Sequence, residues 1–332
     1  MKPASNALMD ASSMPQKSNR PSCLKSRNAL SPYARPLHLW RPSHLLIATM
    51  KNLNDPKNWL ADYPVPDQYG HKYHRGHVGV FSGGLTSSGA GRLAAGAALR
   101  TGAGLVTVLS PGTALVANAS HLTSVMLARL DDADEIEAIV KRRKINTLVC
   151  GPGLGVNART MKIVTKILSL DCTNVLDADA LTSFTDTSED LFTQLKQAKH
   201  QPVLTPHMGE FCRLFGGTNT DDLNDHTERA VAAAKQTNAI IVLKGHQTII
   251  ATPQEAPVIS QNAPPWLATA GSGDVLAGII AGLLAQNMPP KQAAMAGVWL
   301  HSEAGNQAGP GLISEDLDQA LRQVISKLRN GE

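Results

Sequence analysis

Cysteine is scarce in this chain, with four residues among 332. Cys23, Cys150, Cys172 and Cys212 form no Cys-x-x-Cys pair, and no secretory apolar segment precedes them. Proteins that depend on disulfides, and zinc sites built from cysteines, require denser or more regular cysteine spacing. We therefore expect no metal site at these cysteines, and the composition favours a reducing, cytoplasmic compartment.

Aromatic residues and long apolar runs are also scarce. Only 4% of the residues are Phe, Trp or Tyr, which leaves few side chains to stack on nucleic-acid bases. No apolar run approaches the roughly 20 residues that a membrane-spanning helix needs, so the glycine-containing run 275–288 predicts a buried helix. We expect neither a nucleic acid nor a membrane as partner of the folded part.

Acidic residues are nearly missing from the first fifty positions, which contain seven Lys and Arg but a single acidic residue, Asp10. The surplus of six positive charges exceeds the net charge of +4, so the remainder of the chain is slightly acidic. Residues 1–50 are rich in Ser, Pro and Asn without sustained periodicity, which predicts a disordered basic extension before a domain at 51–332. Alternatively, they form a targeting peptide, or Met50 begins the functional product.

From about residue 65 onward, short apolar runs alternate with segments of helical periodicity. The predicted strands are 78–82, 105–109, 147–150, 175–177, 203–204, 240–244 and 248–252. The predicted helices are 90–101, 158–168, 208–215, 222–236, 273–286, 290–307 and 314–327. Near-continuous apolar strands separated by helices are typical of an α/β protein with a mostly parallel sheet covered on both faces. In such sheets ligands bind beyond the carboxyl ends of the strands.

A glycine-rich element near the C-terminus reads Ala268-Thr-Ala-Gly-Ser-Gly-Asp274 and precedes an uncharged apolar run. Small residues let a backbone approach a ligand closely, and the first amides of the following helix can bind an anion. Asp274 at this place could take a proton from a hydroxyl group that attacks a phosphoryl group. Alternatively, Asp274 serves only as the helix N-cap, a position that favours Asp.

Two further segments place polar residues behind predicted strands. The sequence of 204–210 predicts a strand end, a proline turn and a helix start, with Glu210 in the first helical turn. His207 either contributes to the polar wall of an active site or is an ordinary histidine in a turn. Asp177 and Asp179 could hold Mg²⁺ through water, or they could serve a cap and a turn.

The segment Lys244-Gly-His-Gln-Thr248 joins two β-rich runs and predicts a hairpin with Gly245 in its turn. A lysine at the end of a strand can meet a phosphate as a compact charge, although an ordinary solvated lysine fits the same pattern.

Glycines also cluster at 84–91 and 151–155. The first cluster has neither the Lys-Ser/Thr of a P-loop nor a Rossmann Gly-x-Gly-x-x-Gly, so it is a ligand loop or a structural turn. The second can present backbone amides, or it is a plain strand–helix connection. His301 and Glu303 lie inside a predicted helix, and we interpret them as structural.

In this order, the segments 76–84, 89–108, 151–155, 175–181, 204–210, 242–250 and 268–274 resemble the ADP-dependent NAD(P)H-hydrate dehydratase family. The family is a branch of the ribokinase-like superfamily, and the resemblance runs from about Lys51 to the end of the chain. Two departures occur: Leu85 stands where the family usually has Ser, and Met208 stands where it has Pro.

The resemblance implies a ribokinase-like three-layer α/β sandwich and ADP-dependent dehydration of (6S)-NADHX and (6S)-NADPHX, with release of AMP and phosphate. It implies Mg²⁺, ADP as phosphoryl donor, and a homo-oligomer, specifically a tetramer. Its implied substrate-binding residues are Ala90, Gly153, His207 and Asp274, with Asp274 also catalytic. Its implied nucleotide-binding residues are Lys244, Gly245, His246, Gln247, Thr248 and Gly273. The fifty residues before the domain are too few for the epimerase domain of bifunctional relatives, so we expect no epimerase activity.

Two other classes of function remain open. An ATP-dependent small-molecule kinase of the same superfamily would share the Gly-Ser-Gly-Asp element, and a comparison of ADP with ATP as donor separates the two. A non-catalytic nucleotide sensor would bind without turnover.

Overall fold

A computed structural model describes residues 52–218 and 222–331, which belong to the same unit of the chain. The predicted disordered extension at 1–50 lies outside the described residues.

The centre of this unit is a nine-stranded sheet in the order β3-β2-β1-β4-β5-β6-β7-β8-β9. Every pairing from β3 through β7 is parallel, whereas β7–β8 and β8–β9 are antiparallel. The strands are β1 His77–Phe81, β2 Leu105–Ser110, β3 Met126–Arg129, β4 Thr147–Cys150, β5 Thr173–Leu176, β6 Val203–Leu204, β7 Ile240–Leu243, β8 Thr248–Ala251 and β9 Val258–Ser260. The sheet is therefore mostly parallel, as predicted.

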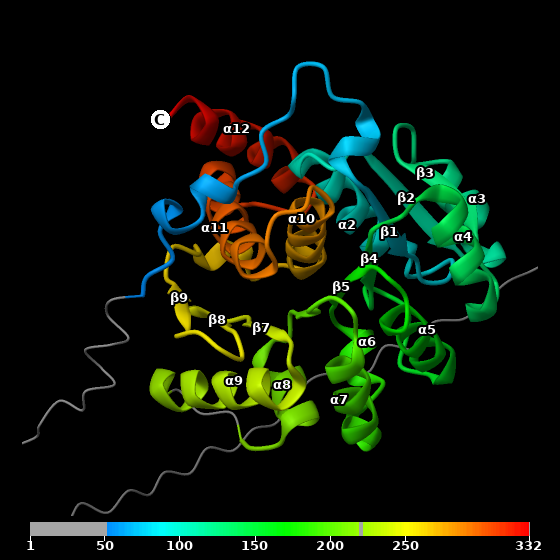
Figure 1. Ribbon diagram of the computed structural model, residues 1–332. Helices are drawn as coiled ribbons and strands as arrows, with labels where there is room; N and C mark the ends of the chain where they lie inside the picture. Colours follow the sequence, from blue (N-terminus) through cyan, green and yellow to red (C-terminus); the bar gives the residue numbers. More distant parts are fainter. Residues whose placement is uncertain (1–51, 219–221, 332) are drawn as a thin grey trace, which may run out of the picture. The chain divides into compact units, whose positions relative to one another are not determined.

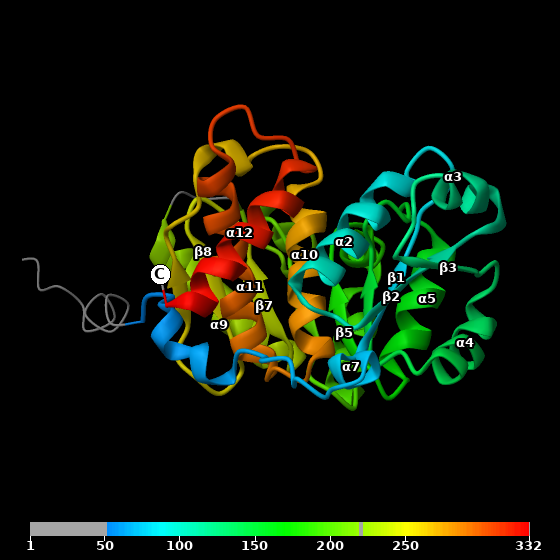
Figure 2. The same cartoon turned by 90° about the horizontal axis from the view of Figure 1, so that it is seen from above.

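Helices cover both faces of the sheet and complete three layers (Figure 1). One layer contains α2 Ser88–Thr101, α10 Ser272–Ala285, α11 Pro290–Ala308 and α12 Asp316–Asn330. The other contains α4 Ile136–Arg143, α5 Ala158–Leu168, α6 Asp179–Thr182, α7 Ser188–Gln197, α8 Met208–Phe215 and α9 Leu223–Thr237. The remaining helices are α3 Leu115–Ala119 and the 3₁₀ helices Pro56–Asn58, Leu60–Asp62, Lys72–Arg75, Gly112–Ala114, Ala133–Glu135, Thr185–Thr187 and Pro265–Leu267. Figure 2 shows α10 alongside α2 and α11.

Alternation along the strands builds two hydrophobic cores. In β7, Ile240 and Val242 join the core beneath α10 and α11, while Ile241 and Leu243 join the core over α8 and α9. Successive strand side chains point to opposite faces, and here both faces are covered, so the strand is apolar throughout.

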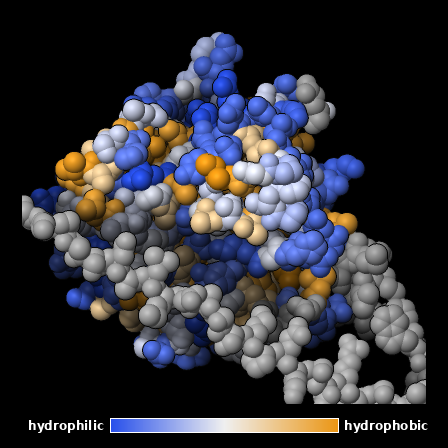
Figure 3. Space-filling view, turned by 180° about the vertical axis from the view of Figure 1, so that it is seen from behind, coloured by the Kyte–Doolittle hydropathy of each residue, from blue (hydrophilic) through white to orange (hydrophobic). Residues whose placement is uncertain are grey.

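Helix α10 is apolar because it is buried. Its side chains from Val275 to Ala285 are almost entirely inaccessible to solvent. No helix in the described part of the chain is long and apolar enough to cross a membrane. On the face seen from behind, hydrophobic residues form small groups among hydrophilic ones (Figure 3).

Glycines bring α10 into close contact with α2. A Cβ added at Gly278 would lie 2.1 Å from the backbone oxygen of Ala94, and one at Gly282 would lie 2.6 Å from that of Ala98. The two backbones touch where a side chain would separate them, which fixes the second half of α10 against α2.

We expect Gly278→Ala to destabilise the fold by about 1–3 kcal/mol, because the new methyl group must push two helix backbones apart. Gly96→Ala in α2 is the matched control, since nothing lies within 4 Å of its added Cβ. The control should gain up to about 1 kcal/mol through helix propensity. Urea unfolding of both variants measures the difference, and equal stabilities would contradict this account of the contact.

The first described residues attach to the edge strand β9 and to α11. Asn54 N donates to Ile259 O, and the Asn54 side chain donates to Met295 O at 2.8 Å. Trp59 is fully buried, donates to the Asn54 side chain, and packs against Trp299. This segment has no periodic sequence pattern, because its order comes from contacts with distant residues.

All seven predicted strands and all seven predicted helices are present, with ends within three residues of prediction. The strands and α-helices missed were β3, β9, α3, α4, α6 and α7. Helix α4 carried a usable signal, since Ile136, Ile139 and Val140 have helical spacing and are buried. Strand β9 and helix α6 have three and four residues, too few for a periodic pattern. Strand β3 is a partly exposed edge.

Candidate active site

A cavity of about 770 Å³ lies at the carboxyl ends of β5, β6 and β7, beside the first turn of α10. Each strand sends one polar residue into its lining: Asp177 after β5, His207 after β6 and Lys244 after β7. Parallel strands end at the same edge of a sheet, so Asp177 and Lys244 become neighbours although they are 67 positions apart in the sequence.

Most predicted site residues line this cavity. They are His207, Lys244, Gly245, His246, Thr248, Gly273 and Asp274. Gln247 belongs to the same β7–β8 turn but is not in the lining. The hairpin with Gly245 in its turn is confirmed by the antiparallel pairing of β7 with β8.

Ala90 and Gly153 lie outside this cavity but beside each other. A Cβ at Gly153 would lie 3.3 Å from the Ala90 Cβ, and Ser87 Oγ donates to Gly153 O at 2.7 Å. The structure therefore brings these two predicted substrate residues together at the ends of β1 and β4.

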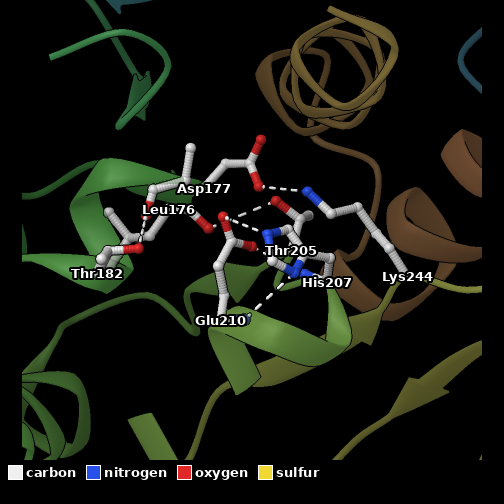
Figure 4. Close-up of polar contacts among 8 residues, drawn as sticks. Leu176, Asp177, Thr182, Thr205, His207, Glu210 and Lys244 are labelled. Carbon is white, nitrogen blue, oxygen red and sulfur yellow. Dashed lines mark hydrogen bonds and ion pairs between the residues drawn. The ribbon is translucent and has the colours of Figure 1, made fainter. Parts of the chain in front are cut away.

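Lys244 is tied to Asp177 by a buried ion pair. Its Nζ donates to Asp177 Oδ1 at 2.7 Å, and the Asp177 side chain is 2% exposed (Figure 4). Although burial opposes the charged form, the nearby carboxylates of Asp177, Glu210 and Asp274 raise the pKa of Lys244. Nζ also lies 3.2 Å from where a Gly273 Cβ would be. A fixed positive charge therefore stands at the N-terminus of α10, where an anion is favoured.

Asp274 is the third residue of α10, and Gly271, in the left-handed conformation, occupies the N-cap. The alternative that Asp274 is merely the N-cap is thus wrong. Burial, together with Asp177, Asp179 and Glu210, raises the pKa of Asp274 to about 7, although Lys244 opposes this shift. A carboxyl group with this pKa can exchange a proton near neutral pH, which suits a general base.

His207 and Glu210 form a capping box at the start of α8. Glu210 N donates to His207 Nδ1 at 3.2 Å, and His207 N donates to Glu210 Oε2 at 2.8 Å. Glu210 is buried in the first turn of α8, as predicted, whereas the His207 side chain is 53% exposed (Figure 4). Its ring is positioned by Glu210 and remains open to a ligand.

Asp177 and Asp179 point to different partners. Asp179 Oδ2 accepts a hydrogen bond from Gly155 N at 2.7 Å, so its carboxylate fixes the glycine loop after β4. This contact favours the turn interpretation for Asp179. No three His, Cys, Asp or Glu within 52–218 and 222–331 form a ready metal site.

His301 contributes more to the site than its structural interpretation implied. It is buried in the lining of the cavity, with Nε2 3.0 Å from Ser272 Oγ at the start of α10. Burial lowers the pKa of His301 to about 4, so the ring is neutral at physiological pH. Glu303, by contrast, accepts from the Asn262 side chain and is not in the lining.

An apolar wall of the cavity was missed by sequence reasoning. It consists of Ala263, Pro264, Pro265, Leu267, Leu276 and Val298. The Ala-Pro-Pro-Trp-Leu run before the glycine-rich element was the available signal, because prolines stiffen a loop without donating hydrogen bonds. A cavity lined by both apolar and charged side chains suits a ligand with a ring system and phosphates.

The three described cysteines outside the terminal extension, Cys150, Cys172 and Cys212, are free thiols. Burial raises the pKa of Cys172 to about 11.

The chain is similar to several known proteins. It is 35% identical over 267 residues to the ADP-dependent (S)-NAD(P)H-hydrate dehydratase of Neisseria meningitidis, covering 78% of this chain and 88% of that protein. It is 38% identical over 284 residues to the bifunctional NAD(P)H-hydrate repair enzyme of Moorella thermoacetica, covering 81% of this chain. The chain spans about half the length of such bifunctional relatives, 52% in this case.

Solved structures give the same result. The ADP/ATP-dependent NAD(P)H-hydrate dehydratase of Bacillus subtilis, co-crystallized with ATP/Mg²⁺, matches with a TM-score of 0.71 and 26% identity, over 83% of this chain and 98% of that one. A hydroxyethylthiazole kinase from Pyrococcus horikoshii matches with a TM-score of 0.53, 77% and 92% coverage and 17% identity, which shows the ribokinase-like fold alone. The cavity at the strand ends is present, with the buried Asp177 in its lining. The sequence pattern of the NAD(P)H-hydrate dehydratase family matches residues 78–325, and the chain therefore belongs to this family.

Proposed function

We propose that this protein is an enzyme that dehydrates (6S)-NADHX and (6S)-NADPHX, using ADP and releasing AMP and phosphate. The observation that carries the proposal is Asp274, whose pKa is raised to about 7 beside Lys244 at the start of α10. A poised base next to a fixed cation at a helix N-terminus suits phosphoryl transfer to a hydroxyl group.

The reaction solves a leaving-group problem, because hydroxide leaves poorly and phosphate leaves well. Asp274 takes the proton of the C6 hydroxyl, whose oxygen bonds to the β-phosphorus of ADP as the bond to AMP breaks. Phosphate then leaves C6 with the bonding electrons, driven by the ring nitrogen, and loss of a ring proton restores the dihydropyridine. Lys244 and the first amides of α10 offset the negative charge of the moving phosphoryl group.

We propose ADP and Mg²⁺ as the nucleotide and the metal ion. Mg²⁺ usually keeps several waters and binds one or two carboxylates together with substrate phosphates. The buried carboxylates of Asp177 and Glu210, both in the lining, fit this role without a three-residue cluster. When bound, the ion would neutralise phosphate charge, while Lys244 through Thr248 and Gly273 hold the nucleotide.

We assign substrate binding to Asp274, His207, Gly153 and Ala90. This assignment is supported by the contact between Gly153 and Ala90 and by the open face of His207. The two departures from the family differ in their surroundings, because Leu85 is exposed whereas Met208 packs against the hydrophobic core.

An absorbance assay tests the function directly. Purified protein with NADHX and ADP should restore the absorbance of NADH at 340 nm and release one AMP and one phosphate per NADH. Omission of ADP is the control, and ATP in its place measures donor choice. Phosphorylation of a small alcohol by ATP without NADH formation would favour the kinase alternative, and ADP binding without turnover would favour a sensor.

We also propose a homo-oligomer, a tetramer as the resemblance implies, and a cytoplasmic location. Several large apolar residues are exposed, among them Leu85, Val116, Val156 and Ile313, and contacts between subunits would cover such residues. Light scattering after size-exclusion chromatography measures the state, and a monomer at micromolar concentration would contradict the tetramer.

A further inference from the structure

Ala178, between the two aspartates of the β5–α6 connection, has a strained backbone. Its φ of +49° and ψ of −118° are a conformation that glycine adopts readily and alanine rarely. Leu181 N and Thr182 N both donate to Ala178 O at 3.0 Å, and Thr182 Oγ1 donates to it at 3.2 Å. These bonds hold the residue in place against the strain.

The two residues that flank Ala178 bind different parts of the site. Asp177 on one side pairs with Lys244, and Asp179 on the other accepts from Gly155 N. The backbone is also crowded here, since a Cβ at Gly151 would lie 1.6 Å from Asp177 O. The turn therefore connects the nucleotide side of the site with the glycine loop on the substrate side.

The conformation of the turn does not explain why residue 178 is alanine. Glycine would adopt the same φ and ψ without strain, so the only group that alanine adds is its methyl group. Ala178 lies in the lining of the cavity, next to Asp177. Strained residues that persist at a ligand site mark a contribution to function.

We propose that Ala178 is a ligand-binding residue whose methyl group forms part of the cavity wall against the bound nucleoside diphosphate, and that its strain is retained for this contact. The proposal deepens the proposed function and rests on it for the identity of the ligand. If the methyl group is removed, we expect the stability of the fold to rise and the affinity for the ligand to fall.

The test is Ala178→Gly in the full chain. Relief of strain should raise the melting temperature by about 2 °C or more. Loss of one buried methyl contact corresponds to roughly a fourfold change in affinity, so the Kd for ADP by calorimetry should rise threefold or more. The value of kcat/KM for NADHX should fall by at least the same factor.

Lys144→Gly is the matched control. Lys144 also has a positive φ, of +55°, but it is exposed at the end of α4 and absent from the cavity. This variant should raise the melting temperature and leave the Kd for ADP unchanged, which separates strain relief from loss of the methyl group.

Calorimetry with ADP alone distinguishes this inference from the proposed function. If wild-type protein binds ADP but shows no NADHX turnover, the proposed function fails while a weaker Kd in Ala178→Gly still supports the wall contact. An unchanged Kd in Ala178→Gly, a lower melting temperature, or a wild-type protein that binds no ADP would overturn the inference.

Discussion

Asp274→Asn should lower the turnover of NADHX by about 10²–10⁴-fold, because the amide cannot accept the proton of the attacking hydroxyl group. The Kd for ADP should change little, since Asn keeps the size of the side chain and Lys244 still meets the phosphates. Single-turnover kinetics with calorimetry separate the two effects. Turnover within tenfold of wild type would remove Asp274 from the proposed mechanism.

The same variant should be more stable than wild type at alkaline pH. The folded pKa of Asp274, about 7, exceeds its ordinary value of 3.8. The folded state therefore holds the proton more tightly than the unfolded chain does, and stability from this group is lost as pH rises from about 4 through 7. At pH 8, ionised Asp274 lowers the free energy of unfolding of the wild type by an amount on the order of 2–4 kcal/mol, and Asp274→Asn does not suffer this loss.

Wild-type kcat/KM should rise with pH through about 7 as Asp274 ionises, and this limb should disappear in the variant. Asp318→Asn is a matched control, because Asp318 also stands third in its helix, α12, but is half-exposed and pairs with Arg100. We expect its turnover and pH profile to follow wild type. A control with the same loss would show a general effect of charge.

Lys244→Met should both destabilise the fold and weaken ADP binding by at least tenfold. It leaves the buried carboxylate of Asp177 without its partner, which typically costs about 3–5 kcal/mol. It also removes the cation beside the N-terminus of α10. Urea unfolding and ADP calorimetry measure the two losses in one variant.

The double variant Asp177→Asn with Lys244→Met separates folding from binding. With both charges gone, most of the stability should return, to within about 1–2 kcal/mol of wild type. ADP binding should stay weak, and calorimetry without Mg²⁺ keeps the proposed metal-binding role of Asp177 out of the comparison. Recovery of ADP affinity in the double variant would mean that Lys244 serves only to neutralise Asp177.

Much of the architecture followed from the sequence because its signals are local. Strand β4 and helices α5 and α8 were predicted with the observed bounds, since an apolar strand and an amphipathic helix show their periodicity within ten or so residues. Short elements such as β9 and α6 were missed because they are stabilised by contacts with distant segments.

The sequence by itself determined which residues can do chemistry: the glycine-rich start of α10 with Asp274, the lysine after β7, and the carboxylates after β5. Only the tertiary structure decided how these residues act on one another. It pairs Lys244 with Asp177 across 67 residues, turns Asp179 away to Gly155, and brings His301 into the wall. The proton affinity of Asp274 also arises there, because its pKa depends on burial and on charges from three other segments. Spacing along a chain carries no record of such distances, which the parallel sheet sets when it aligns its strand ends at one edge.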